Sequence, residues 1–593
     1  MSRRLTALLF FLYIINLAAL PGCDSNGPVA PGGADGPPEW VASEGVASVV
    51  AGECAITVYW GEAIDYQDPP VEYLVYMDSD SDPFDQDPIV RESNDPFTFT
   101  NLGIAEEYWF GVRCEDSANP PHRDDNSKVV GARTRDLGWA QAWGGPGFDK
   151  CSDVAVDSMG NVYATGYYEQ SIDFDPGPGE DIHTTDGEDI FAIFLVKYSP
   201  QGEYQWARTW GGKGYFIVLD WGHALDIDPD DNIVVTGEFA GNIDFDPGPG
   251  EDFHASKLIS GSFYGNDAFV SKFDPDGNYL WGRNWSVFNG DSGEDIACDS
   301  TGNVYVLGES DSYYLIGSVY GTCSYTFLRK LDSFGNLQWQ LLFGQDGSHV
   351  YPGSVIVDNL DNVCLSGYFH NVTQIDLDPG TGEDIHVSAA DHDCFLIKLD
   401  SSGVYQWGQT WGGSRYFPSD HYGLASDAYG NIFVVGSFLD SVDFDPGDGV
   451  DIRTADGTVN PYVCKYSPDG QYEWVQTWTV CGIDSADSVV VTSSGNICVS
   501  YNYFCLSERD CARYALRMLD AGGTMIWEQT WTDDIGYLGI MGLCGDIYDN
   551  IYIAGGIKGN IDMDPGPGEV LHANPDPEDG EAFVMKLLPD GLW

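Results

Sequence analysis

The fold is decided by DVAVDSMGNVYATG at 153–166, with the acidic segment IDFDPGPGEDIH at 172–183 and FAIFLVKYSPQGEYQWARTW at 191–210. This pattern recurs along the chain, and the asparagine after its first turn marks each copy. The seven copies have Asn161, Asn232, Asn303, Asn362, Asn431, Asn496 and Asn550, at intervals of 71, 71, 59, 69, 65 and 54 residues. The chain is therefore a repeat protein over most of its length.

The first copy contains the signals of four strands, and the later copies follow its order. In the first copy, short runs rich in Val, Ile, Tyr and Phe alternate apolar with polar residues near 153–157, 161–167, 191–198 and 204–210. The connection Asp157-Ser-Met-Gly160-Asn161 suits a type I turn that ends in a left-handed glycine. Repeats of four strands at this period are typical of β-propellers.

The phase of the repeat predicts how the propeller closes. Six copies have a fourth strand, but the seventh ends at 589–593, which is too short for one. The segment Gly138–Trp143 matches a fourth strand and precedes the first copy. We expect it to pair with the third strand of the last copy, near 581–588, which closes a seven-bladed ring over 137–593 and removes the open edge.

A second aromatic follows the first tryptophan of each fourth strand by four residues, so both rings lie on one strand face. These second aromatics are Trp143, Trp210, Trp285, Phe343, Trp411, Trp478 and Trp531. We expect them to pack between blades. The alternative is a stack of tryptophans around a quinone cofactor.

Residues 39–136 lack the repeat and contain single short strands, which is typical of a β-sandwich. Thr100-Asn-Leu102 followed by Tyr108-Trp-Phe-Gly-Val112 resembles the fibronectin type III family, in which a leucine precedes a corner tyrosine. Trp60 matches the early core tryptophan of that family. The resemblance implies a spacer or an adhesion module. The expected fold is thus all-β, a fibronectin type III-like sandwich followed by a seven-bladed β-propeller closed by an N-terminal strand.

The N-terminus has the features of an export signal, with Arg3-Arg4 before an apolar run at 5–20. Leu20-Pro21-Gly22-Cys23 resembles the lipobox of bacterial lipoproteins, although proline is less usual at the second place. The resemblance implies a signal peptide at 1–22, acylation of Cys23, and membrane contact through that lipid alone. The Gly- and Pro-rich residues 23–38 then form a flexible tether. The expected location is the bacterial cell envelope, periplasmic or at the cell surface; the alternative is ordinary secretion.

The charge composition limits the kinds of partner that the protein can bind. The net charge is −67, from 93 acidic and 26 basic residues. Such a surface repels nucleic-acid phosphates and anionic lipids, and it favours cations. The sequence contains no nucleophile-elbow, zincin or phosphate-loop motif. It has no C-x-x-C spacing either, so we expect no zinc site and no organic cofactor, and we interpret the strand cysteines as buried apolar residues.

The acidic loops carry the most distinctive chemistry, the pattern D-x-D-P-G-x-G-E-D. Carboxylates at places one, three and nine suit a hard cation such as Ca²⁺. These candidate ligands are Asp173, Asp175, Asp181, Asp244, Asp246, Asp252, Asp376, Asp378, Asp384, Asp443, Asp445 and Asp451. A fifth copy has Asp562 and Asp564 but Val570 at place nine. The spacing resembles the calcium loops of integrin-type propellers, but glycine stands at place five. The alternative is a Pro-Gly turn with exposed carboxylates.

A histidine or arginine recurs ten residues after the first aspartate, as His183, His254, His386, Arg453 and His572. A group that recurs in five of the seven copies indicates a structural role, since an active site is usually assembled once; transition-metal ligation is the alternative. Ligand-face candidates lie instead in the connections that depart from the repeat. They are Tyr215, Phe216, Trp221, His223, Arg415, Tyr416, Phe417, His421 and Tyr422. Aromatic rings beside Arg or His suit sugars or peptides, and the alternative is that they fill the central channel.

The motifs D-V-A-V-D-x-x-G-N-V-Y-x-x-G and G-x-x-x-W resemble the bacterial SBBP and NHL-type propeller repeats over 137–593. The resemblance implies the fold and says little of function. The leading hypothesis is an envelope-anchored, non-enzymatic binding, adhesion or scaffold protein for a protein or glycan partner. The alternative is a propeller lyase or glycosidase that acts on polysaccharide.

Overall fold

The computed structural model describes two compact units, Met1–Asp136 and Leu137–Trp593, which are treated separately. In the first unit it describes residues 39–40, 46–51, 55–60, 63–64, 71–78, 83–85, 88–92, 96–100, 107–118 and 121–133. In the second it describes residues 138–592 except 186–189, 212–219, 261–262, 289, 317–318, 345–348, 371–373, 389–391, 415–422, 457–458, 480–482, 505–511, 532–536, 565–569 and 574–579. Cys23 and the predicted signal peptide and tether lie outside the described residues.

The first unit has two antiparallel sheets around one core. One sheet contains β2 (Val46–Ala51), β3 (Ala55–Trp60) and β7 (Phe97–Thr100); the other contains β6 (Val90–Glu92), β5 (Glu72–Asp78), β8 (Glu107–Glu115) and β9 (Val129–Arg133). The short strands β1 (Glu39–Trp40) and β4 (Ala63–Ile64) pair, and η1 (Pro83–Asp85) is a 3₁₀ turn. Trp60 is buried, with its ring centroid 5.6 Å from that of Tyr73 on the facing sheet. Residues of both sheets thus share one hydrophobic cluster.

The second unit consists of four-stranded antiparallel groups, which we call blades, and the described residues form seven of them. Blade 1 is β11 (Lys150–Val156), β12 (Val162–Glu169), β15 (Phe191–Tyr198) and β16 (Tyr204–Gly211); blade 2 is β17 (Trp221–Ile227), β18 (Ile233–Ala240), β23 (Asn266–Phe273) and β24 (Tyr279–Trp285); blade 3 is β25 (Gly290–Cys298), β26 (Val304–Ile316), β27 (Val319–Leu331) and β28 (Leu337–Phe343); blade 4 is β29 (His349–Val357), β30 (Val363–His370), β33 (His392–Leu399) and β34 (Tyr405–Ser414).

The other blades follow the same order. Blade 5 is β35 (Leu424–Ser426), β36 (Ile432–Phe438), β39 (Asn460–Tyr466) and β40 (Tyr472–Thr477); blade 6 is β41 (Ile483–Val491), β42 (Ile497–Phe504), β43 (Ala512–Leu519) and β44 (Met525–Trp531); blade 7 is β45 (Tyr537–Gly545), β46 (Ile551–Lys558), β49 (Glu581–Leu587) and β10 (Trp139–Trp143). The pair β21 (Leu258–Ser260) and β22 (Phe263–Tyr264) lies between β18 and β23 in the chain. One parallel bridge, Ser324 to His349, joins blades 3 and 4. The first strands of successive blades contact one another, and β45 of blade 7 contacts β11 of blade 1.

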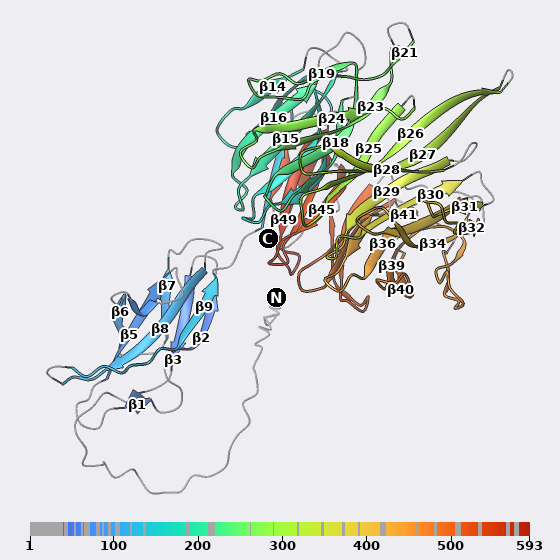
Figure 1. Ribbon diagram of the computed structural model, residues 1–593. Coiled ribbons are helices and arrows are strands. Elements are labelled where there is room, and N and C mark those ends of the chain that lie inside the picture. The colour runs from blue at the N-terminus through green and yellow to red at the C-terminus, as the bar shows by residue number, and fades with distance from the viewer. Residues whose placement is uncertain are drawn as a thin grey trace, which may run out of the picture. The chain divides into compact units, whose positions relative to one another are not determined.

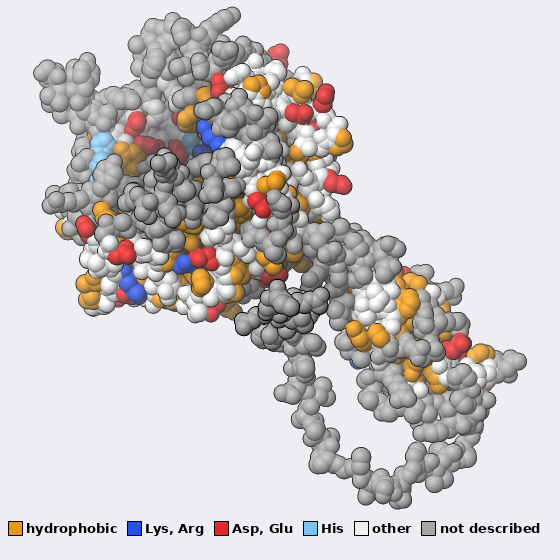
Figure 2. Space-filling model, turned by 180° about the vertical axis from the view of Figure 1, so that it is seen from behind, with side chains coloured by type: hydrophobic (Ala, Val, Ile, Leu, Met, Phe, Trp, Pro, Cys, Tyr) orange, Lys and Arg blue, Asp and Glu red, His pale blue; other side chains and the backbone are white. Residues whose placement is uncertain are grey.

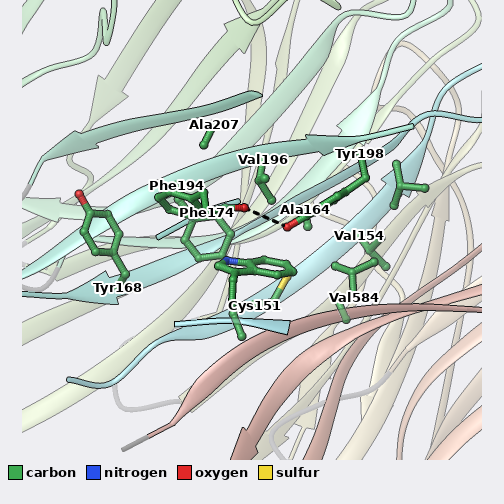
Figure 3. Packing of buried hydrophobic residues seen from close by; sticks show 14 of the residues in the cluster. Cys151, Val154, Ala164, Tyr168, Phe174, Phe194, Val196, Tyr198, Ala207 and Val584 are labelled. Carbon is green, nitrogen blue, oxygen red and sulfur yellow. Dashed lines mark hydrogen bonds between the residues drawn. The ribbon is translucent and has the colours of Figure 1, made fainter. Parts of the chain in front are cut away.

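The last blade combines strands from both ends of the second unit. β10 pairs antiparallel with β49, with Trp139 opposite Lys586 and Trp143 opposite Ala582. Figure 1 shows β45 and β49, coloured red, beside the blue-green strands that begin the repeat. Val584 of β49 belongs to the same buried cluster as Val154 and Cys151 of β11, and Figure 3 shows these side chains together. The predicted pairing of Gly138–Trp143 with the last copy is confirmed.

Each blade is fixed to the next by a tryptophan under a glycine turn. The turn glycine has a positive φ, and an added Cβ would lie 2.6–3.3 Å from the nearest ring atom, closer than ordinary van der Waals contact. The pairs are Trp139 with Gly202, Trp206 with Gly277, Trp281 with Gly335, Trp339 with Gly403, Trp407 with Gly470, Trp474 with Gly523 and Trp527 with Gly591. Where the indole also donates a hydrogen bond, a carbonyl of the same turn accepts it, as Pro468 does from Trp407 at 3.1 Å.

The second aromatic of each fourth strand is buried in all seven blades. Trp143 of blade 7 lies 5.5 Å from Tyr198 of blade 1, and Trp210 of blade 1 lies 5.2 Å from Phe273 of blade 2, between ring centroids. The prediction that these rings pack between blades is confirmed. The strand cysteines follow their prediction in part: Cys364, Cys464 and Cys498 are buried, whereas Cys298 and Cys544 are half-buried.

Gly470→Ala tests the tryptophan contact. An added Cβ would lie 2.6 Å from Cδ2 of Trp407, and the residue keeps a φ of 76°. The matched control is Gly495→Ala, whose turn has a φ of 85° and no heavy atom within 4 Å of the added Cβ. Both variants lose stability through the positive φ, and we expect Gly470→Ala to lose about 1–3 kcal/mol more through the collision. Equal unfolding free energies in denaturant titrations of the two variants would contradict the contact.

Candidate functional site

Five of the seven first strands contain an irregularity that leaves one residue outside the pairing with the second strand. The pairing of β11 with β12 shifts between Cys151 and Asp153, which leaves Ser152 without a partner residue. Corresponding shifts leave out His223 on β17, Glu294 on β25, Asp487 on β41 and Met541 on β45. A β-bulge of this kind redirects a side chain and is common beside binding sites.

These bulge residues line one cavity of about 560 Å³. The cavity wall also contains Asp153 and Lys150 of β11, Glu309 of β26 and residues 351–354 of β29. Its lining therefore comes from strands of six blades and from Gly423, just before β35. Figure 2 shows carboxylate, histidine and basic side chains around a hollow in the second unit. A volume of this size is typical of a site for a small molecule or for one part of a larger ligand.

The cavity has more carboxyl groups than basic groups. His223 Nδ1 lies 3.3 Å from Glu294 Oε2 of the next blade. Burial lowers the pKa of His223, but the nearby carboxylates of Glu294 and Glu238 outweigh it, so the pKa is raised. Burial and the like charges of Asp311 and Glu294 raise the pKa of Glu309 well above its usual range. The crowded carboxyl groups therefore favour binding a proton or a cation.

Two further aspartates add to this acidity. Burial raises the pKa of Asp487 to about 7, against hydrogen bonds from Asn502 and Ser485 that lower it. Burial also raises the pKa of Asp153 to about 8, although Asp153 accepts a hydrogen bond from the Leu225 amide of the next blade at 3.0 Å. Burial lowers the pKa of Lys150 in the same wall.

Stacked aromatic side chains form two parts of the cavity wall. Tyr167 and Trp221 lie 5.2 Å apart between ring centroids at an interplanar angle of 24°. Tyr351 and Tyr368 lie 4.8 Å apart at 19°. Flat aromatic faces beside hydrogen-bonding groups are suited to sugar rings and to organic cations.

The predicted ligand-face residues divide into two groups. Trp221 and His223 lie in the cavity wall. The others, Tyr215, Phe216, Arg415, Tyr416, Phe417, His421 and Tyr422, lie outside the described residues. The sequence interpretation missed Glu294, Glu309, Asp487 and Tyr351. The signal was present in part, because Ser152, His223, Glu294, Asp487 and Met541 each stand five residues before the turn residue at 157, 228, 299, 492 or 546.

The predicted acidic loops are the tips of small hairpins on the blades. These are β13 (Ser171–Asp173) with β14 (Ile182–Thr184), β19 (Asn242–Asp244) with β20 (Phe253–Ala255), β31 (Gln374–Asp376) with β32 (Ile385–Val387), β37 (Ser441–Asp443) with β38 (Ile452–Thr454), and β47 (Asn560–Asp562) with β48 (Leu571–Ala573). The residue between the first two aspartates is buried in each hairpin: Phe174, Phe245, Leu377, Phe444 and Met563. Figure 3 shows Phe174 beside Phe194, and its carbonyl accepts from the Tyr198 hydroxyl at 3.5 Å.

The first two aspartates of these hairpins accept hydrogen bonds from the loop backbone. In the second copy, Asp244 Oδ1 accepts from the amides of Asp246 at 3.2 Å and Asp252 at 2.8 Å. Asp246 Oδ1 accepts from Gly248 at 2.7 Å, and its other oxygen lies where a Cβ on Gly250 would be. The copies that begin at Asp173, Asp376 and Asp443 repeat these contacts. The carboxylates thus hold the turn, as Asx-type contacts do.

The third aspartate connects the hairpin to the fourth strand of its blade. Asp252 accepts from the Tyr279 hydroxyl at 2.6 Å and lies 3.3 Å from His254 Nε2, while His254 Nδ1 lies 2.8 Å from Asn284 Oδ1. His183 and His386 contact Thr209 and Thr410 in the same way, and Arg453 replaces them beside Asp451. These contacts give the recurring histidines a structural role.

Among the described residues, no group of three or more His, Cys, Asp or Glu side chains is arranged to hold a metal ion. A calcium ion at a hairpin would have to compete with the amides and hydroxyls that already bind the carboxylates. The calcium prediction stays a prediction. In the same described part of the chain, no helix is long and apolar enough to cross a membrane.

Comparison with known proteins supports a β-propeller. No family model matches the chain. An uncharacterized WD repeat-containing protein of Acanthamoeba polyphaga mimivirus is 23% identical over 438 residues, which cover 62% of this chain and 31% of the relative. The match thus spans about a third of that relative's length. WD repeats form propeller blades.

Solved structures of low similarity also match. A protein of unknown function from Dyadobacter fermentans is 10% identical, with a TM-score of 0.34 over 61% of this chain and 93% of its own. An ulvan lyase of polysaccharide lyase family PL25 is 13% identical, with a TM-score of 0.37 over 70% of this chain and 93% of its own. Likenesses at this level carry no argument about activity.

The calcium prediction is tested by thermal unfolding with millimolar Ca²⁺ and with a chelator. A calcium site in the hairpins raises the melting temperature with Ca²⁺ and lowers it with chelator, because the ion binds the folded state alone. A melting temperature that is the same in both solutions would contradict it. Mg²⁺ at the same ionic strength is the control for screening of the net charge.

Asp487→Asn tests the acidity of the cavity. The folded protein holds a proton on Asp487 that the unfolded chain releases, so this stabilisation is present below the unfolded pKa and is lost as pH rises through about 7. Asparagine keeps the shape and cannot ionise. We expect its unfolding free energy to fall less than that of the wild type between about pH 5 and about pH 8.5, by about 1 kcal/mol after allowance for solvent screening. The control is Asp448→Asn, an exposed site, and parallel pH profiles for Asp487→Asn and wild type would contradict the assignment.

Proposed function

We propose that the protein is a glycan-binding protein of the bacterial cell envelope, and that the cavity lined by the bulge residues holds the glycan. The observation that carries this proposal is the convergence of stacked aromatic rings and hydrogen-bonding carboxyl groups on one cavity. Sugar rings stack on aromatic faces while their hydroxyls bond to carboxyl groups. The acidic wall disfavours anionic polysaccharides, because they would bring like charges into it.

We further propose that the second unit is a closed seven-bladed propeller. The support is the pairing of β10 with β49 and the tryptophan contacts, which run from each blade to the next and from blade 7 back to blade 1. A ring of this kind brings the bulges of β11, β17, β25, β41 and β45 toward one axis, which is the condition for a shared cavity.

The other parts of the proposal rest on the sequence. The lipobox-like segment before Cys23 supports a lipid anchor in the envelope, and the two facing sheets around Trp60 support a fibronectin type III-like spacer. The lipid and residues 23–38 would then hold the glycan-binding unit near the membrane surface.

A second candidate function is cleavage of a polysaccharide. The observation that favours it is the place of Glu309, whose pKa is raised by burial and by the charges of Asp311 and Glu294, in the same cavity as the His223 and Glu294 pair. A carboxyl with a raised pKa is the usual general acid of a glycosidase. A reducing-end assay with each bound glycan separates the two functions, since a binding protein releases no new ends.

Tyr351→Ala tests the binding function. Glycan-array binding, followed by calorimetry with the best oligosaccharide, should show an affinity about tenfold weaker for this variant because one stacking face is lost. Tyr429→Ala is the control, since that ring is 85% exposed on a turn and is not in the cavity wall. Failure of the wild type to bind any oligosaccharide, or equal binding by the Tyr351 variant, would overturn the proposal.

A further inference from the structure

The cavity wall shows a charge pattern that narrows the ligand further, an inference that rests on the proposed function. Five carboxyl groups, those of Asp153, Glu294, Asp295, Glu309 and Asp487, line the same cavity. The basic side chains in its wall are Lys150 and His223. Four of the five carboxyl groups have a raised pKa, and burial is the first cause in each of these cases. The cavity wall thus contains more carboxyl groups than can all be ionised at the same time.

Two buried side-chain nitrogens of the cavity wall, His223 Nε2 and Trp221 Nε1, have no hydrogen-bond partner among the described residues. His223 Nδ1 faces Glu294. His223 also lies beside the Trp221 ring, 6.0 Å between centroids. Glu294 and Glu309 can accept hydrogen bonds from a cationic donor.

We propose that the cavity selects glycans that carry free amino groups, with the ammonium held between Glu294 and Glu309 and the sugar ring against the aromatic faces. The ammonium group brings the positive charge that the wall lacks. Its attraction is strengthened by the low dielectric of a cavity walled by protein and by the protein's net charge of −67, which steers cations toward it. Tyrosine and tryptophan faces add cation–π attraction.

Selection of an ammonium group predicts that protons are released when the glycan binds. An ammonium that binds among carboxyl groups favours their ionised form, so binding near pH 7 releases protons to the buffer. An uncharged acetylated sugar favours no such release. The number of protons is measured by calorimetry of the same titration in two buffers that differ in ionisation enthalpy.

The experiment uses the full-length protein. All titrations use one preparation, so that any lipid on Cys23 is the same in each of them. The probes are a glucosamine oligomer with free amines, the same oligomer fully N-acetylated, and a uronic acid oligomer. We expect the free-amine oligomer to bind at least tenfold more tightly than the acetylated one and to release protons, and we expect no measurable binding of the uronic acid oligomer.

Two variants keep the proposal falsifiable if one fails to fold. Glu294→Gln and Glu309→Gln should each reduce the preference for the free-amine oligomer several-fold while retaining binding of the acetylated one. Glu251→Gln, the same change at an exposed hairpin site, should leave the preference unchanged. Circular dichroism spectra and melting curves verify the fold of each variant.

The outcomes separate this inference from the proposed function. Equal affinity for the free-amine and acetylated oligomers, without proton release, overturns the amine selection and leaves glycan binding in place. Absence of binding to every oligosaccharide overturns both. A lysine-rich peptide is tested in parallel, and if it binds in the cavity and the free-amine glycan does not, the ammonium comes from protein and the glycan assignment is wrong.

Discussion

The second unit depends on one contact made repeatedly, an indole ring covered by the glycine turn of the next blade. The turn can approach the ring because its residue has no Cβ and takes a positive φ, as Gly470 does over Trp407. The contact crosses the blade boundary, where a sheet has no backbone ladder of its own. Since Trp139 belongs to a strand from the N-terminal side and lies under Gly202, while Trp527 lies under Gly591, the same contact secures both ends of the repeat. These contacts support the closed ring that we propose for the second unit.

Much of this architecture could be predicted from the sequence, because the same strand and turn patterns recur in several copies of the repeat. The alternation of apolar residues placed the four strands of blade 1 within a few residues of β11, β12, β15 and β16. The unfinished seventh copy predicted that Gly138–Trp143 pairs with the end of the chain. The hairpins at the acidic loops were missed, since strands of three residues leave too short an alternation to detect.

The site was harder to predict, for a physical reason. The sequence around the bulge residues Ser152, His223 and Glu294 has the pattern of a regular strand. A bulge changes the direction of a side chain without changing the amino-acid composition of the strand. The conspicuous aspartates attracted the functional interpretation instead. In the structure, however, Asp244 and Asp246 are occupied by amides of their own turn, and Phe245 between them anchors the hairpin in the core. The repeated aspartates thus hold their own turns, whereas the bulge residues, which differ from blade to blade, line the cavity.

The bulges have a consequence for how such a protein changes over generations. A residue that stands outside the backbone ladder and faces the cavity can be exchanged with little effect on strand pairing, whereas its neighbours on the strand cannot. Serine, histidine, glutamate, aspartate and methionine at Ser152, His223, Glu294, Asp487 and Met541 already show this freedom within one chain. The repeated blades thus keep their strand pairing while the bulge residues that line the cavity differ. Single substitutions at these positions would change the cavity wall, and a protein designer could vary the same few residues.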